Sequence, residues 1–225
     1  MKPKIITISE DIRGANEDKA EKNRGRLNRH GILCLNVMSS PGAGKTSLIK
    51  QTINLLKGKT RIAVIEGDVA SSIDADDISR QGISVVQINT AGGCHLDANM
   101  TGKALDNLPL EDIDLLIIEN VGNLICPAEF ALGEHKRATL LSLPEGDDKP
   151  HKYPLMFTET DAVLLNKIDL LPHMDFNINA FNKVVTGLNP DVSLFQVSCK
   201  TGEGLEGWIS WLQEQLISIK NRQYS

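Results

Sequence analysis

The chain contains 225 residues and carries a formal net charge of −5, with 24 basic and 29 acidic side chains. This length suits one domain with a large core, because domains usually span ~50–250 residues. The acidic and well-mixed charge disfavours a general nucleic-acid binder, which would show a basic patch. No apolar run approaches the ~18 residues that a membrane span requires.

The N-terminus and the cysteines indicate a cytoplasmic protein. Residues 1–4 are not followed by an apolar run long enough for a signal peptide. The four cysteines are too widely spaced for a dense disulfide framework, so we expect free thiols or metal ligands in a reducing compartment. They are Cys34, Cys94, Cys126 and Cys199.

Residues 1–30 form a polar segment in which acidic and basic side chains alternate at helical spacings. This pattern predicts a solvated helix or arm, and a helix that docks a partner is the alternative. From residue 32 onward, apolar runs recur at regular intervals. We therefore divide the chain into an N-terminal arm, 1–30, and one domain, 31–225.

The domain shows apolar runs that alternate with stretches of helical periodicity. The predicted strands are 32–38, 61–65, 85–88, 115–118, 139–143, 162–165 and 194–197. The predicted helices are 46–56, 74–81, 96–105, 176–188 and 205–219. This alternation predicts an α/β fold, with a mostly parallel sheet covered by helices on both faces. Residues 144–154, rich in Pro, Gly and charge, are predicted to form a loop.

A glycine-rich turn between the first strand and the first domain helix predicts a phosphate-binding loop of the P-loop NTPase kind. Backbone N–H groups of such a turn and of the helix N-terminus carry positive partial charge and bind anions. Ser39 stands where the usual pattern has its first glycine, so a small residue is kept. The alternative is a helix-capping turn without a ligand. The predicted nucleotide-binding residues are Pro41, Gly42, Ala43, Gly44, Lys45, Thr46 and Ser47.

Mg²⁺ prefers hard oxygen ligands, and the ends of strands beside a phosphate loop can supply them. The Thr46 hydroxyl is placed to bind Mg²⁺. Asp68 follows the second strand, and Glu119 ends the strand 115–118. We therefore predict a Mg²⁺ site formed by Thr46, Asp68 and Glu119.

Four residues are predicted to act in phosphoryl chemistry. Lys45 can reach the β- and γ-phosphates as a point charge. The segment from Glu119 to Gly122 is similar to a switch element that senses the γ-phosphate. Asp74 is a candidate for orienting the attacking water, although carboxylates that open a helix also stabilise its N-terminus.

Asn166-Lys167-Ile168-Asp169 follows an apolar strand and predicts guanine selectivity. A carboxylate such as Asp169 can accept hydrogen bonds from N1–H and N2–H₂ of guanine, whereas adenine lacks this pair of donors. Asn166 can contact the other edge of the purine, and Lys167 can lie over the ring. A second loop after a strand is predicted to complete the base site. Its residues are Ser198, Cys199 and Lys200.

Cys94-His95 and Cys126 form a possible metal site. Thiolate and imidazole groups suit Zn²⁺ and Ni²⁺. Three ligands do not close a tetrahedral site, so a labile ligand or a second copy of the chain would have to complete it. From residue types alone, an ordinary buried thiol at Cys126 and a helix-capping His95 remain an open alternative.

Taken with these motifs, the chain resembles the HypB family, the nickel-incorporation GTPases of hydrogenase maturation, which are SIMIBI-class P-loop GTPases. The matching segments are residues 40–47, 66–68, 92–96, 119–127, 145–150 and 166–169. The resemblance implies a slow Mg²⁺-dependent GTPase that dimerises on binding GTP. It further implies an interface site for Ni²⁺ or Zn²⁺ at Cys94, His95 and Cys126. The implied partners are a HypA-type nickel chaperone and the large subunit of an immature NiFe hydrogenase.

Three rival functions remain open. A urease-type nickel accessory GTPase would carry Cys-Pro-His, but Cys126-Pro127 is followed by Ala128. A small-molecule kinase would not need the guanine motif. A regulatory GTP-binding module with purely structural zinc would bind a metal that never responds to nucleotide. Residues 1–30 contain no cysteine and only His30, so the nickel-storage tract of some HypB proteins is not expected here.

Overall fold

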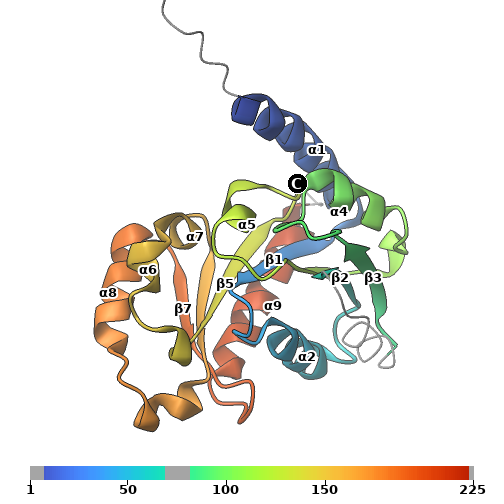
Figure 1. Ribbon diagram of the computed structural model, residues 1–225. Coiled ribbons are helices and arrows are strands. Elements are labelled where there is room, and N and C mark those ends of the chain that lie inside the picture. The colour runs from blue at the N-terminus through green and yellow to red at the C-terminus, as the bar shows by residue number, and fades with distance from the viewer. Residues whose placement is uncertain (1–7, 69–81, 223–225) are drawn as a thin grey trace, which may run out of the picture.

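The computed structural model describes residues 8–68 and 82–222, and within these ranges seven strands form one parallel sheet (Figure 1). Its order is β3-β2-β4-β1-β5-β6-β7. The strands are β1 (Leu33–Ser39), β2 (Ile62–Asp68), β3 (Ser84–Asn89), β4 (Leu115–Glu119), β5 (Lys136–Ser142), β6 (Ala162–Asn166) and β7 (Ser193–Gln196). Each predicted strand overlaps one of these, so the predicted fold class is confirmed.

The helices of the described ranges lie on both faces of the sheet (Figure 1). They are α1 (Ile8–His30), α2 (Lys45–Leu56), α4 (Ala98–Leu105), α5 (Cys126–Glu129), α6 (Lys149–Lys152), α7 (Pro154–Thr158), α8 (Ile178–Leu188) and α9 (Leu205–Arg222). Short 3-10 helices, η1 (Leu110–Asp112), η2 (Leu143–Glu145) and η3 (Ile168–His173), lie between some of them. The helix predicted over 74–81, with Asp74, lies outside the described residues.

One prediction of the domain's architecture is wrong. Residues 144–154 are not a featureless loop, because they contain α6 and the start of α7. Pro150 and Pro154 fall in the first turns of these helices. Proline is tolerated there because the first N–H groups of a helix have no intrahelical partner.

Alternation along the strands divides the core between the two faces. Leu33, Leu35 and Val37 of β1 point to the face covered by α2 and α9. Cys34 points to the opposite face, which α1 and α4 cover beside β2 and β4. The same face is covered by α5, α7 and α8 beside β5 and β6. No helix of the described ranges has the length and apolar character needed to cross a bilayer.

The polar helix α1 packs on the domain along one narrow stripe. Asn16, Ala20, Asn23 and Leu27, spaced by three or four residues, are buried along this stripe. Gly133 lies directly beneath it with a positive φ of 102°, and an added Cβ would lie 2.6 Å from Asn23 Cβ. The contact therefore fixes one register of the helix on the domain.

The side chains of Asn16 and Asn23 join two segments of the domain. Asn16 accepts from Ala98 N at 2.9 Å and donates to Ala131 O at 2.8 Å. Asn23 donates to Ala98 O at 2.7 Å and to Leu132 O at 2.9 Å. Helix α1 therefore holds the first turn of α4 against the chain that follows α5.

An ion pair joins the starts of β2 and β4. Arg61 donates to Asp114 from its backbone N at 3.0 Å and from Nε at 3.1 Å, both to Oδ2. The Nζ of Lys220 in α9 lies 3.2 Å from Asp114 Oδ1. Hydrogen bonds from the Arg61 side chain, opposed by partial burial, hold the pKa of Asp114 well below its usual range.

We predict that Asp114→Asn makes folding stability less sensitive to acid. Because the folded-state pKa is depressed, the carboxylate stabilises the fold above its unfolded pKa of ~3.9, and this contribution disappears as pH falls through the folded pKa. Urea unfolding of wild type and variant should give a difference in unfolding free energy that is constant at pH 6–8 and shrinks below ~pH 4. The control Asp112→Asn changes a more exposed partner of Arg61 at 3.8 Å and should have little effect. A difference that stays constant down to pH 3 would contradict the prediction.

Candidate functional site

The predicted phosphate loop joins β1 to α2 with the backbone shape that such a loop needs. Gly42 and Gly44 have φ of 77° and 105°, a region that favours glycine. Lys45 Nζ donates to Ser39 Oγ at 2.9 Å. Ser39, which stands at the position of the first glycine, therefore binds the lysine of the loop. From the sequence, Ser39 was expected only to keep a small residue in place of that glycine.

The predicted base motif lies directly against the phosphate loop. Asn166 Nδ2 donates to Ala43 O at 2.9 Å, and Lys167 Nζ donates to Gly42 O at 2.7 Å. A Cβ on Gly44 would lie 2.6 Å from Asn166 Nδ2, so glycine is needed for this approach. Two segments more than 120 residues apart in sequence are therefore hydrogen-bonded to each other.

The second base loop, 198–200, closes the same site. Asn166 Oδ1 accepts from Cys199 N at 3.1 Å, and Ser198 Oγ donates to Asp169 Oδ1 at 2.7 Å. Burial raises the pKa of Cys199 to about 11, so this thiol stays neutral at physiological pH. These residues surround a cavity of about 350 Å³ lined by Gly44, Ser47, Asn166, Lys167, Asp169, Leu170, Cys199 and Lys200.

The predicted Mg²⁺ ligands lie beside the first turn of α2. Thr46 Oγ1 donates to Glu119 Oε1 at 2.9 Å, so the hydroxyl and the carboxylate already adjoin. Two side-chain oxygens at this separation fit a hard cation. Asp68 ends β2, the strand next to β4, and its side chain lies outside the description. Asp74, the candidate for orienting water, lies outside the described residues.

Two carboxylates near this point were not predicted as site residues. Glu66 is 3% exposed and aligns in register with Glu119 on the neighbouring strand. Its signals in the sequence are a charge directly after a buried apolar run and its place in segment 66–68, one of those that carry the family resemblance. Glu145 accepts a hydrogen bond from Ser40 Oγ of the phosphate loop, and it also accepts from Ser142 N at 2.7 Å.

The predicted switch element touches the phosphate loop. An added Cβ on Gly122 would lie 3.0–3.1 Å from three atoms of Pro41. The backbone at Gly122 therefore packs on the loop, which is the position from which a terminal phosphate could be sensed. The candidate catalytic residues Lys45, Glu119 and Gly122 lie at one edge of the sheet, where β1 and β4 end.

Cys94, His95 and Cys126, the residues that the family resemblance implies as metal ligands, lie together in the structure. Their ligand atoms all lie within 4.8 Å of one another. Cys94 Sγ is 3.1 Å from Cys126 Sγ and 3.4 Å from His95 Nδ1. Cys94 is exposed, and the other two are half-buried. The geometry suits a metal ion that can enter from solvent.

The cluster also differs from the alternative of a capping histidine and a buried thiol. Asp97 is the N-cap of α4, and its side chain accepts from Met100 N at 2.7 Å. His95 instead stacks on Phe130, with ring centroids 4.1 Å apart. Burial lowers the pKa of His95, which favours the neutral, metal-binding imidazole. The hydrogen bond with Cys94 raises the pKa of Cys126, and burial adds to this effect.

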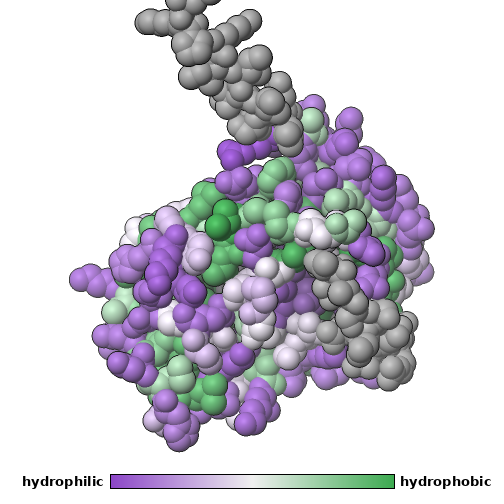
Figure 2. All heavy atoms as spheres, in the orientation of Figure 1, coloured by the Kyte–Doolittle hydropathy of each residue, from purple (hydrophilic) through white to green (hydrophobic). Residues whose placement is uncertain are grey.

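The surface next to the cluster is partly apolar. Hydrophobic and hydrophilic residues are interspersed over the face shown in Figure 2. Ile125, directly before Cys126, is 55% exposed and is among the most exposed large apolar residues of the described chain. An exposed apolar side chain therefore lies directly beside the cysteine–histidine cluster.

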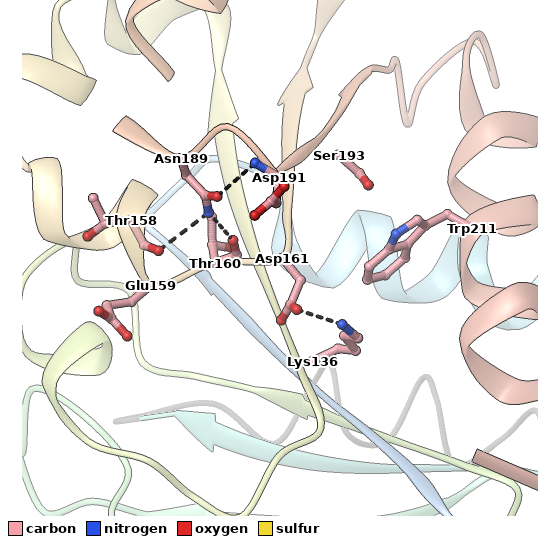
Figure 3. Close-up of a pocket in the computed structure, with 9 residues that line it drawn as sticks. All are labelled: Lys136, Thr158, Glu159, Thr160, Asp161, Asn189, Asp191, Ser193 and Trp211. Carbon is pink, nitrogen blue, oxygen red and sulfur yellow. Dashed lines mark hydrogen bonds and ion pairs between the residues drawn. The ribbon is translucent and has the colours of Figure 1, made fainter. Parts of the chain in front are cut away.

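A separate cavity of about 430 Å³ lies at the opposite edge of the sheet, where β5, β6 and β7 begin (Figure 3). Its polar side chains join neighbouring loops. Asn189 donates to Thr160 O at 2.7 Å, and Lys136 Nζ lies 2.7 Å from Asp161 Oδ1. These contacts hold together the loops before β6 and β7 and the start of β5. Because the cavity lies where the strands begin, it is at the opposite end of the strands from the predicted nucleotide site.

Comparison with known proteins identifies the family of the chain. Residues 33–196 match the family described as CobW/HypB/UreG, nucleotide-binding domain. A hydrogenase maturation factor HypB from Azotobacter vinelandii is 48% identical over 212 residues, which cover 94% of this chain and 70% of that protein. A probable hydrogenase maturation factor HypB from Methanocaldococcus jannaschii is 42% identical over 216 residues, which cover 96% and 98%.

Solved structures show the same fold. HypB from Helicobacter pylori in complex with nickel superposes with a TM-score of 0.86 and 38% identity, covering 91% of this chain and 96% of that one. HypB from Archaeoglobus fulgidus gives a TM-score of 0.85 and 38% identity, covering 90% and 99%. The signal recognition particle receptor FtsY from Elizabethkingia anophelis shares only the fold, with a TM-score of 0.52 and 18% identity. The chain therefore belongs to the HypB group of the CobW/HypB/UreG nucleotide-binding family.

Proposed function

We propose that this protein is a GTP-hydrolysing metallochaperone that carries nickel and helps to insert it into NiFe hydrogenase. The observation that carries the proposal is the convergence of Cys94, His95 and Cys126 within 4.8 Å, on segments next to the predicted switch element. Thiolate and imidazole ligands suit nickel, and a HypB relative has been solved in complex with nickel. The relatives are named hydrogenase maturation factors, which supports a hydrogenase as the protein that receives the metal.

Guanine is the proposed base. Asp169 would accept from both donors of the guanine edge, while Ser198 holds the carboxylate in place through a 2.7 Å hydrogen bond. Adenine would leave this carboxylate without the two donors. Sites built for such hydrogen bonds can discriminate by ~10⁴–10⁵.

Mg²⁺ is the proposed cofactor, held by Thr46 and Glu119 together with Asp68. A bound Mg²⁺ would neutralise charge on the phosphates during transfer. Lys45 would bind the phosphates from the first turn of α2, and the loop N–H groups would hold their oxygens. No arginine finger is evident in the motifs, so we expect slow hydrolysis, near the ~10⁻³–10⁻⁴ s⁻¹ of intrinsic switches.

A dimer is the proposed working form. Three protein ligands leave the metal site open, and a second copy of the cluster could complete it. The exposed Ile125 beside Cys126 supports a contact at this surface. A HypA-type nickel chaperone would load the site, and the hydrogenase large subunit would receive the metal. A module in which zinc only holds a dimer remains the alternative, and it would show no response of metal to nucleotide.

We predict that Asp169→Asn weakens GTP binding by ~10²–10⁴-fold. Two hydrogen bonds to a charged group are lost, and each contributes ~1.5–3 kcal/mol. Fluorescence titration with a labelled GDP should measure the loss, and xanthine nucleotides should bind the variant better than the wild type. Retention of wild-type GTP affinity would show that Asp169 does not read the base.

We predict that Thr46→Val slows GTP hydrolysis by ~100-fold or more, whereas Thr46→Ser stays within ~10-fold of wild type. Valine removes the hydroxyl at almost constant volume, and a catalytic metal contributes several kcal/mol. Single-turnover assays across a Mg²⁺ titration should show that Thr46→Val loses its metal dependence. If the Mg²⁺ dependence of hydrolysis were unchanged in Thr46→Val, the Thr46 hydroxyl would not be a Mg²⁺ ligand.

We predict that Cys94→Ala weakens Ni²⁺ binding by at least ~10–100-fold. Loss of a residue that only hydrogen-bonds a metal ligand already costs this much affinity, and Cys94 would be a ligand itself. It should also abolish any metal-dependent strengthening of the dimer. Light scattering with GDP or a slowly hydrolysed GTP analogue, with and without Ni²⁺, measures the second effect. The control Cys34→Ala changes a fully buried core thiol and should keep both responses. A constant oligomeric state, indifferent to nucleotide and metal, would favour the structural-zinc alternative.

A further inference from the structure

The residue directly after the predicted switch carboxylate is buried, and its hydrogen bonds lead toward both segments that carry the cysteine–histidine cluster. Asn120 is 1% exposed and follows Glu119, which binds Thr46. Its backbone N donates to Val37 O at 3.0 Å, so its position follows the β1–β4 pairing. A buried polar side chain at this point requires specific partners.

The first arm of this arrangement reaches the Cys94-His95 segment. Asn120 Oδ1 accepts from Leu96 N at 3.2 Å and from Val121 N at 2.9 Å. Leu96 follows His95 directly and is itself fully buried. A displacement at the end of β4 therefore acts on the backbone that carries one cysteine and the histidine.

The second arm reaches α5, which begins at Cys126. Asn120 Nδ2 donates to Asn36 Oδ1 at 3.2 Å, and Asn36 Nδ2 donates to Glu134 Oε1 at 3.3 Å. Glu134 Oε1 also accepts from Arg137 Nε at 2.6 Å. Arg137 Nη1 then donates to Ala128 O in α5 at 3.2 Å.

The buried members of this chain do not have water as an alternative partner. Asn36 is 0% exposed and Glu134 is 2% exposed. Moving one member leaves its neighbour with an unmet hydrogen bond in a low-dielectric interior, so the members move together. Both arms start from Asn120, which directly follows Glu119 in the chain.

We propose that Asn120 is the positioning residue that couples the nucleotide site to the cysteine–histidine cluster. It acts on the 90–97 segment through Leu96 N and on α5 through Asn36. The inference rests on the proposed function, because it names the residue through which nucleotide alters the metal site. Coupling of this kind typically amounts to ~5–150-fold in affinity, and it is reciprocal.

Hydrogen–deuterium exchange tests the proposal without nickel. In wild type, a GTP analogue with Mg²⁺ should change exchange in residues 90–97 and 124–130 relative to GDP. Asn120→Ala should bind both nucleotides but lose both differences, and the ratio of Ni²⁺ dissociation constants between the two nucleotide states should fall to about one. Wild-type differences that persist in Asn120→Ala, or their absence in wild type, would overturn the inference.

Asn23→Ala is the matched control. Asn23 is another buried asparagine, and its hydrogen bonds go to Ala98 and Leu132, which follow the two cluster segments in the chain and are not predicted nucleotide-site residues. Its loss should weaken Ni²⁺ binding equally in both nucleotide states and leave their ratio intact. If the ratio of Ni²⁺ dissociation constants fell to about one in Asn23→Ala as well, the effect of Asn120→Ala would reflect general loosening of the cluster segments and not loss of coupling.

Asn36→Ala separates the two arms and replaces Asn120→Ala if that variant does not fold. It should remove the nucleotide response of residues 124–130 and keep that of 90–97. Loss of both responses, or of neither, would contradict the assignment. If wild type shows the exchange response but no nucleotide effect on Ni²⁺ affinity, the proposed carrier cycle fails while the role of Asn120 stands.

Discussion

The parallel pairing of β1 with β4 is the constraint on which the candidate site depends. Parallel strands end at the same edge of a sheet, so the pairing of Val37 with Glu119 places the phosphate loop beside the switch carboxylate. The neighbouring β5 and β6 continue the edge and bring Asn166 to the loop backbone. Binding groups scattered over more than 150 residues of sequence thus meet because the strands share one direction.

Much of this arrangement was predictable from sequence because it follows from local patterns. The apolar runs of the strands identify the sheet, and glycines with a following Lys45 identify the loop. Parallel strands then bring Asn166 and Asp169 to the same edge. The convergence of Cys94 with Cys126 depended instead on family resemblance, because no short spacing links residues that lie 32 positions apart.

The remaining features arise from tertiary contacts that leave little trace in sequence. Asn120 is one polar residue in a longer motif, and only the fold shows that it joins Leu96 to Asn36. The role of α1 was also hidden, because its buried stripe consists largely of asparagine and alanine rather than large apolar residues. Hydrogen bonds replace apolar contact there, so periodicity of hydrophobicity gives no signal.

The packing of α1 on the domain depends on the absence of a side chain at Gly133. Its missing side chain leaves the space that the helix occupies, with Ala20 O only 2.7 Å from where a Cβ would lie. A methyl group at this position would clash with the backbone of α1 and push the helix away from the domain. The hydrogen bonds by which Asn16 and Asn23 join α4 to the chain after α5 would then be lost, although no predicted nucleotide-binding residue and no predicted metal ligand had changed.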